Sequence, residues 1–354
     1  MELKGEVIDR GLCTLCGMCL GRCPYVKAID DRLAVVFSCG IESGRCYLSC
    51  PRTPTDWDAV EASVMGEGAD YIPELGRVIK LYMVRGTEPR LTRNSQDGGT
   101  VTTLLAVALE TGMMEAGVVT STDDGLIPLY KVARNEQEVI KASGSRYLAA
   151  TGLKAWNEAL KQDITKLGVV GRPCQVMAVR KQEFNFSEEL KGRSFLVIGL
   201  FCMWTLAWDF NDYLKGLVGT KRIRKVSIPK GELKVELEDG VLTRPVEEIR
   251  RFARQACGYC WDMTSELADL SVGALEAVPG WNTLIIRTPK GEELVSKART
   301  MGWLEVKEYP EESLKELLVA ARGKKERAVQ ELKKVADSGQ IIVDLDKPRF
   351  SMFA

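Results

Sequence analysis

The sequence predicts an α/β domain built on a mixed sheet, preceded by a small cysteine-rich module. Two observations support this prediction. Seven of the eleven cysteines fall between Cys13 and Cys50, and the next cysteine along the chain is Cys174. From about Val78 onward, helical patterns and buried-strand patterns alternate, as they do in α/β domains.

The length and composition fit a protein of two units. A chain of 354 residues exceeds one ordinary core, and 45% hydrophobic with 28% charged residues is typical of globular proteins. We place the module at residues 1–55, a linker at 56–90 and the α/β domain at 91–354. No apolar run predicts a transmembrane segment, and the equal numbers of basic and acidic residues give no indication of nucleic acid as a partner.

The cysteine and histidine content restricts the chemistry. The first residues lack the apolar stretch of a secretory signal, so eleven cysteines indicate metal or redox chemistry in a reducing cytoplasm. The absence of histidine excludes Ser-His-Asp hydrolases, histidine-ligated zinc hydrolases and Rieske-type clusters. Hydride transfer to a flavin needs none of these groups, because the cofactor carries the chemistry.

The module contains the run Cys-x2-Cys-x2-Cys-x3-Cys-Pro, the spacing of bacterial ferredoxins. Three thiolates on one tight loop hold a [4Fe–4S] cluster, and the fourth cysteine, followed by proline, serves a second cluster. Zinc sites usually use two separated cysteine pairs and fit this run poorly. In the ferredoxin crossover pattern, the expected ligands of the first cluster are Cys13, Cys16, Cys19 and Cys50.

The second half of this ferredoxin-like module is irregular, because a regular motif would have further cysteines at Gly40 and Ser43. The thiolates left for the second cluster are Cys23, Cys39 and Cys46. An oxygen of Glu42 or Ser43 would complete a four-iron cluster, which we favour. A three-iron cluster, or a lost site with buried cysteines, are the alternatives.

The apolar pattern predicts the elements of the α/β domain in order. Helices are expected at 101–109, 175–181 and 311–337, the last as a surface helix rich in Leu, Lys, Glu and Ala. Strands are expected at 117–120, 167–171 and 195–201, and an antiparallel hairpin or meander at 226–242.

Four cysteines of the α/β domain form a second group. Two follow buried strands and therefore lie at the carboxyl edge of one sheet, where α/β proteins place their ligands. The other two form a Cys-x2-Cys pair. The group consists of Cys174, Cys202, Cys257 and Cys260. Four thiolates suit either a third [4Fe–4S] cluster or a structural zinc, and the spacing alone leaves both open.

Two loops are candidates for binding an anionic cofactor. The first precedes the helix expected at 101–109, and its glycines let the backbone approach a phosphate at the helix N-terminus. A plain turn is the alternative. Neither loop has the Gly-x-Gly-x-x-Gly fingerprint of a nicotinamide site. The loops are Ser95-Gln96-Asp97-Gly98-Gly99 and Gly144-Ser145-Arg146-Tyr147.

Residues of about 90–300 resemble the beta subunits of coenzyme F420-reducing hydrogenases and their dehydrogenase relatives. The similar strings are both loops and, in the order of the family, residues 170–175, 199–203, 257–264, 267–273, 280–283 and 286–288. With its ferredoxin-like module, the chain is most similar in layout to the electron-input subunit of the F420H2 dehydrogenase.

The resemblance implies that the loops 95–99 and 144–147 bind FAD, and that the four later cysteines ligate a [4Fe–4S] cluster beside it. It further implies hydride transfer between coenzyme F420 and the flavin, followed by passage of single electrons to the ferredoxin-like module. The expected protein is an oxidoreductase subunit with FAD and two or three clusters. Its expected partners are other subunits of a redox complex, and ferredoxin is a further candidate partner.

Some strings differ from those of relatives that use F420. Trp204 stands where they have a glutamate, and Glu276 adds a carboxylate that would repel the polyanionic tail of F420. The string of residues 230–234 also differs. The alternative function is an adaptor of the same fold that links a heterodisulfide reductase-, formate dehydrogenase- or hydrogenase-like partner to ferredoxin without F420.

Overall fold

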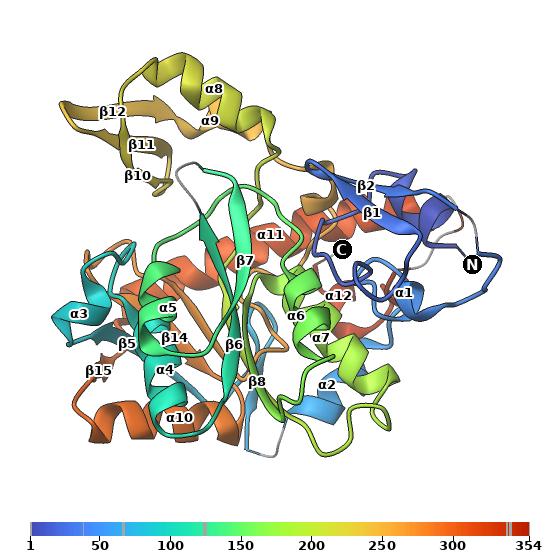
Figure 1. Ribbon diagram of the computed structural model, residues 1–354, viewed down its shortest axis with the longest axis horizontal. Coiled ribbons are helices and arrows are strands. Elements are labelled where there is room, and N and C mark those ends of the chain that lie inside the picture. The colour runs from blue at the N-terminus through green and yellow to red at the C-terminus, as the bar shows by residue number, and fades with distance from the viewer. Residues whose placement is uncertain are drawn as a thin grey trace.

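The computed structural model describes residues 2–37, 39–65, 68–122, 126–337, 339 and 342–353. Its centre is an eight-stranded mixed sheet of order β15-β5-β14-β13-β9-β8-β6-β7, with β13, β9, β8 and β6 parallel (Figure 1). The expected α/β class with a mixed sheet is therefore confirmed. The strands are β5 (Lys80–Gly86), β6 (Ala116–Thr122), β7 (Pro128–Ala133), β8 (Lys166–Gly171), β9 (Ser194–Leu200), β13 (Leu270–Ala274), β14 (Asn282–Ile286) and β15 (Leu304–Glu308).

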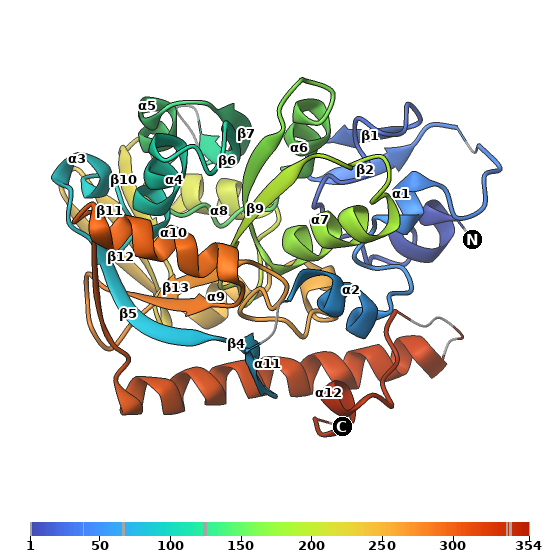
Figure 2. The same cartoon turned by 90° about the horizontal axis from the view of Figure 1, so that it is seen from below.

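Both faces of the sheet are buried, as strand β9 illustrates. Phe195 and Val197 pack into one hydrophobic layer, and Leu196 and Ile198 pack into the other. One layer contains α4 (Thr100–Glu110), α5 (Glu136–Lys141) and α10 (Pro289–Thr300). The opposite layer contains α6 (Leu153–Ala159), α7 (Pro173–Asn185) and the long α11 (Glu311–Asp337), which Figure 2 shows along one side of the molecule.

The helices and strands predicted for this domain are confirmed. The helices expected at 101–109, 175–181 and 311–337 are α4, α7 and α11, and the expected strands are β6, β8 and β9. The meander expected at 226–242 is a separate sheet of β10 (Ile223–Ser227), β11 (Glu232–Leu237) and β12 (Gly240–Pro245). It shares a small hydrophobic cluster with α8 (Asp209–Val218) and α9 (Val246–Arg250).

The cysteine-rich module lies at one end of the long axis of the molecule, opposite α3 (Pro89–Thr92) (Figures 1 and 2). It contains η1 (Lys4–Ile8), the hairpin of β1 (Val26–Ile29) and β2 (Arg32–Val35), and α1 (Arg45–Leu48). The stretch expected as a linker contains α2 (Trp57–Val64), the hairpin of β3 (Asp70–Ile72) and β4 (Gly76–Val78), and strand β5. Residues 66 and 67 of that stretch lie outside the described residues.

The module shares one hydrophobic core with the α/β domain. Leu12 and Met18 belong to the same buried cluster as Trp156 of α6 and Val179 of α7. Asn157 adds hydrogen bonds, because its side-chain amide donates to the carbonyls of Met18 and Leu20 at 2.7 and 2.8 Å. The domain boundary near residue 55 therefore stays a prediction, since the hydrophobic core continues from one side of it to the other.

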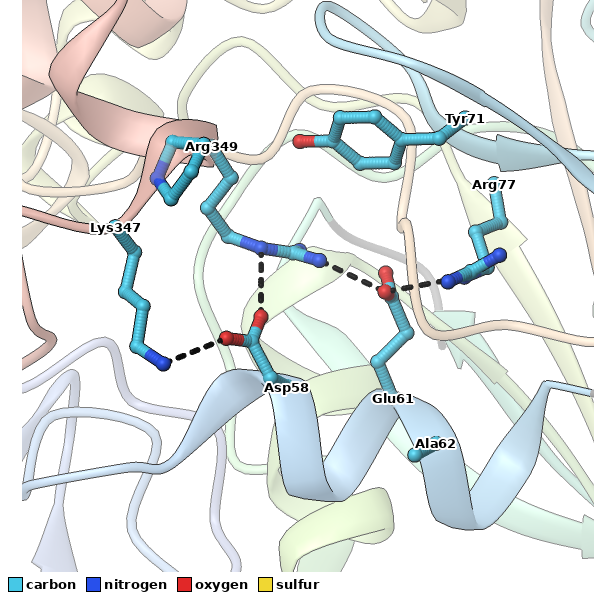
Figure 3. Close-up of a pocket in the computed structure, with 8 residues that line it drawn as sticks. Asp58, Glu61, Ala62, Tyr71, Arg77, Lys347 and Arg349 are labelled. Atoms are coloured by element: carbon cyan, nitrogen blue, oxygen red, sulfur yellow. Dashed lines mark hydrogen bonds and ion pairs between the residues drawn. The ribbon is translucent and has the colours of Figure 1, made fainter.

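Ion pairs fasten the C-terminal segment to α2 (Figure 3). Arg349 of α12 (Pro348–Ser351) places Nη2 at 2.8 Å from Glu61 Oε2 and Nε at 3.4 Å from Asp58 Oδ1. Lys347 pairs with the same Asp58 at 3.1 Å, and Arg77 approaches Glu61 from the other side at 3.3 Å. The last residues of the chain therefore pack beside the helix that follows the module.

Candidate functional site

Cys174 and Cys202 lie at the carboxyl edge of the sheet, as predicted. Strands β8 and β9 are parallel neighbours, and Cys174 opens α7 directly after β8 while Cys202 follows β9. The backbone N–H of Thr205 donates to Cys257 Sγ at 3.4 Å, which holds the Cys-x2-Cys loop against the Cys202 loop. We call these four cysteines (Cys174, Cys202, Cys257 and Cys260) the body set.

The members of the body set influence one another's pKa values, which indicates that they lie near one another. Burial raises the pKa of Cys174; Arg172 opposes this shift, and Cys260 and Cys257 add to it. Burial likewise raises the pKa of the Cys202 thiol to about 12, with the strongest opposition from Lys324. Because burial disfavours the thiolates, the set requires nearby positive charge, such as iron, to ionise fully.

Two buried cations border the body set. Arg172 leaves Nη1 and Nη2 without a hydrogen-bond partner among the described residues. Lys324 of α11 is 3% exposed and donates from Nζ to the backbone carbonyls of Cys202 and, at 2.8 Å, Asp262. Both side chains are placed to offset negative charge on the thiolates.

Lys324 is a residue that sequence reasoning missed, because α11 was expected to be a surface helix. The apolar stripe of α11 runs through Leu317, Ala321 and Ala328, which are all buried. Position 324 falls on the same stripe at helical spacing, so the pattern contained the signal that this lysine points inward.

The predicted ligands of the first module cluster also lie together. Burial raises the pKa of Cys19, and the charges of Cys16, Cys13, Cys50 and Cys46 add to this shift, in decreasing order. We call Cys13, Cys16, Cys19 and Cys50 the first module set. It adjoins the body set, because Cys174 is among the charges that add to the burial-driven rise in the pKa of Cys16.

The loop of the first module set presses directly on the α/β domain. Gly17 has φ of 87°, and a Cβ at this position would lie 2.4 Å from the carbonyl oxygen of Thr151. The N–H of Leu153 donates to the carbonyl of Cys16 at 2.9 Å. Only glycine fits this approach, so the loop fixes the module on α6.

The three remaining cysteines form the second module set, Cys23, Cys39 and Cys46. Burial raises the pKa of Cys46, and Cys23 and Cys39 contribute to the rise. All three line one small cavity, together with Glu2 and several apolar side chains. The oxygen donors expected from the sequence, Glu42 and Ser43, do not line it. Glu2 precedes the cysteine run and belongs to no cysteine motif, so no spacing signal pointed to it.

Among the described residues, no three cysteine or carboxylate side chains are grouped as ligands of a single metal ion. In a four-iron cluster each thiolate binds its own iron, so the ligands surround a volume instead of one point.

The two predicted cofactor loops also meet. Gly144 has φ of 94°, and a Cβ there would lie 2.9 Å from Arg146 Nη1 and 3.4 Å from the carbonyl oxygen of Asn94. Burial raises the pKa of Tyr147 to about 12, and the charge of Asp97 in the first loop contributes to the rise. Loops 95–99 and 144–147 are therefore neighbours.

The meander and the start of α4 complete this surface. Lys225 of β10 donates from Nζ to the carbonyl of Gln96 at 2.8 Å. Gly99 is the N-cap residue of α4 and has φ of 70°. Because glycine has no side chain, it gives the first N–H groups of the helix no side-chain hydrogen bond. Arg146 Nε is buried and lacks a partner in the described part of the chain. Its Nη1 and Nη2 donate to the carbonyls of Ser145 and Ser143, both at 3.1 Å, which fixes the guanidinium beside the loop. Free helix N–H groups and a guanidinium with one unpaired N–H fit the diphosphate of a dinucleotide.

The two residues that differ from the F420-using pattern lie in different environments. Trp204 is partly buried and packs against the hydrophobic cluster of the meander. Glu276 is exposed in the loop between β13 and β14.

Comparison with known proteins now gives the family. The model of the coenzyme F420 hydrogenase/dehydrogenase beta subunit N-terminus matches residues 81–157, and that of its C-terminus matches residues 164–312. The chain belongs to this family. The matched ranges contain both cofactor loops and the complete body set, and membership makes the chain an oxidoreductase of the beta-subunit type.

Individual relatives agree with the family assignment. The beta subunit of the coenzyme F420 hydrogenase of Methanosarcina barkeri is 32% identical over 68% of this chain and 85% of its own length. One of the F(420)H(2) dehydrogenase subunits of Methanosarcina mazei is 28% identical over 87% of this chain and 88% of its own length. A chain of the F420-reducing [NiFe] hydrogenase complex from Methanosarcina barkeri has a TM-score of 0.71 at 29% identity, covering 77% of this chain and 98% of that one.

None of the helices in the described ranges is both long and apolar enough to cross a membrane.

Proposed function

We propose that this chain is a flavin- and iron–sulfur-containing subunit that transfers electrons between coenzyme F420 and the one-electron centres of a larger redox complex. The observation that supports this proposal is the series formed by the three cysteine sets. The body set adjoins the first module set through Cys174 and Cys16, and the first module set adjoins the second through Cys19 and Cys46. A two-electron cofactor that feeds one-electron carriers needs such a series.

FAD is the cofactor that fits the two loops. The N-terminus of α4 and Arg146 would hold its diphosphate, and Lys225 supplies a further positive charge at the same surface. When bound, the flavin supplies the exchange of a hydride for two single electrons. The chain's own contribution is to hold the isoalloxazine near the body set.

The body set would ligate one [4Fe–4S] cluster and the first module set another. Arg172 and Lys324 would offset the charge of the body-set thiolates. Arg172 Nε donates to Gln175 Oε1 at 3.4 Å, and Lys324 Nζ donates to the carbonyl of Asp262 at 2.8 Å. The second module set would hold a third cluster through three thiolates, and Glu2, which lines the same cavity, is a candidate for an oxygen ligand. These clusters require reduced cysteines, which is why we propose a cytoplasmic location.

The proteins that resemble this chain are named as subunits of a hydrogenase and of a dehydrogenase. We propose that this chain likewise assembles with partner subunits. The exposed Glu276 favours the second candidate function, the adaptor that passes electrons between a partner and ferredoxin without using F420, since a carboxylate repels the polyanionic tail of F420.

Reduction by F420H2 tests the proposal. The chain, purified without oxygen, should contain one FAD and about eight to twelve iron atoms. F420H2 should bleach the flavin and cluster absorbance, while the Arg146→Ala variant should lose flavin and this response together. If dithionite reduces the protein and F420H2 does not, the adaptor function is correct. An iron content near four with one zinc would refute the body cluster.

A further inference from the structure

An exposed apolar surface surrounds the cavity of the second module set. Five large apolar side chains of this region are more than a third exposed, and three of them also line the cavity. We call them the hairpin patch: Tyr25 (36%), Ile29 (59%), Val36 (60%), Phe37 (62%) and Ile41 (64%).

The patch gathers its residues on one hairpin and the loop that follows it, in contrast to the other exposed apolar residues. The rings of Tyr25 and Phe37 contact each other at a tilt of 48° with centroids 5.1 Å apart, and both rings line the cavity together with Ile41. Elsewhere, Val241 on β12 and Val319 on α11 are single exposed side chains on separate elements. Single exposed apolar residues are ordinary, but contiguous patches mark contact surfaces.

Some of the charged side chains around the patch are paired within the chain. Lys4 pairs with Asp9 at 2.6 Å, and Arg45 pairs with Glu189 at 2.6 Å. Asp31, in the turn of the same hairpin, pairs with Arg254 at 3.1 Å. Lys27 and Arg32 of the hairpin are exposed and form no ion pair within the described part of the chain, so a partner at this surface would meet both apolar side chains and positive charge.

We propose that the hairpin patch docks a small iron–sulfur carrier protein of the ferredoxin type, which exchanges single electrons with the second module set. This inference rests on the proposed function. The set is the last of the series and lies at the end of the molecule opposite α3, which adjoins the flavin loop 95–99 (Figure 1). Electrons from the flavin therefore leave the chain here.

The exchange is a transfer of one electron. The centre held by the second module set is oxidised by one electron and the carrier is reduced by one, with no bond or proton transferred. Five side chains on one hairpin and loop suit the small interfaces of transient redox encounters, below about 1,200 Å², and not the larger interfaces of permanent subunits.

Binding is the first test. The probe is a fluorescently labelled bacterial two-cluster ferredoxin, titrated with the iron-loaded full chain while both proteins are oxidised. The variant Ile29→Ser/Val36→Ser changes patch residues that do not line the cavity, so its iron content should stay that of the wild type. We expect its Kd to rise at least tenfold, and the matched surface control Val241→Ser/Val319→Ser to bind like the wild type.

Electron transfer is the second test. Wild type and variants are reduced with dithionite, desalted and mixed with either ferredoxin or benzyl viologen, a small acceptor that needs no docking surface. Ile29→Ser/Val36→Ser should slow reduction of ferredoxin about as much as it weakens binding, and leave reduction of viologen unchanged.

Three results would overturn the inference. The first is unchanged ferredoxin binding in an iron-loaded Ile29→Ser/Val36→Ser variant. The second is an equal loss of the viologen rate, which would show that the patch only shields the cluster. The third is a second module set without iron, which would refute that part of the proposed function as well. Neither test uses F420H2. If the chain proves unable to oxidise F420H2, the proposed use of F420 fails and the docking inference still stands.

Discussion

Lys181 of α7 is expected to hold Cys50 and the end of the module on the α/β domain. The residue is 2% exposed, and its ammonium donates to the carbonyls of Cys50, Thr53 and Pro54 at 2.8, 3.2 and 3.2 Å, and to Thr53 Oγ1 at 2.9 Å. Lys181→Met keeps the aliphatic stem and removes every donor, which leaves three carbonyls without this partner.

The carbonyls of Cys50 and Thr53 keep the hydroxyls of Thr53 and Thr55 as donors, both at 2.9 Å, so the carbonyl of Pro54 is the one left unpaired. An unpaired buried carbonyl costs about 1–3 kcal/mol. The cost is partly offset because the ammonium no longer has to be buried; burial lowers the pKa of Lys181 to about 8. With the hydrogen bonds to Cys50 and Thr53 also lost, we expect Lys181→Met to lower the free energy of unfolding by about 1–3 kcal/mol.

Urea unfolding of the iron-loaded protein without oxygen, followed by circular dichroism and by iron release, measures this effect. Lys215→Met, at a lysine whose side chain is 68% exposed on α8, is the matched control and should change stability by no more than about 0.5 kcal/mol. A loss below about 1 kcal/mol for Lys181→Met, with iron retained to the same urea concentration, would refute the anchoring role.

Three further substitutions test the sites. Cys257→Ser should remove about four iron atoms and the body-cluster signal in electron paramagnetic resonance while the module signals remain; an unchanged iron count would show that Cys257 is not a ligand. Arg146→Ala should raise the Kd for FAD about tenfold, as loss of one charge-assisted hydrogen bond predicts, and unchanged flavin retention on gel filtration would contradict this. Trp204→Ala should lower the free energy of unfolding by about 3 kcal/mol, because Trp204 packs against the meander. A variant of wild-type stability that fails to assemble with a partner would instead make Trp204 a docking residue.

The sequence predicted the elements of the α/β domain because its apolar pattern is strong where strands are buried on both faces. Residues 195–201 show this well, since β9 packs against a helical layer on each side. The role of residues 80–86 was not predictable in the same way. Strand β5 pairs with β14 and β15, which lie some two hundred residues later, and no local pattern encodes such partners.

The cysteine sets were predictable for a related reason. Fixed spacing within a short loop encodes the first module set, and the ends of two adjacent parallel strands encode half of the body set. Lys324 was not found, because it reaches its site from a segment remote in sequence, and Glu2 was not found, because it belongs to no cysteine motif. The expected oxygen donors, Glu42 and Ser43, were chosen for nearness in sequence; their neighbours Ile41 and Gly44 line the cavity and they do not.

The core shared by the module and the C-terminal segment has a consequence for synthesis of the protein. The module is synthesised well before Phe350 and Phe353, yet its hydrophobic cluster includes both of these residues. The N–H of Thr55 also donates to the carbonyl of Ile342 at 3.0 Å. We therefore expect the thiols to remain exposed until the segment around Phe350 has been synthesised, and iron to be inserted only afterwards. Nascent chains arrested before this segment should carry no clusters, and recombinant yield should depend on how fast iron–sulfur assembly factors reach the folded chain.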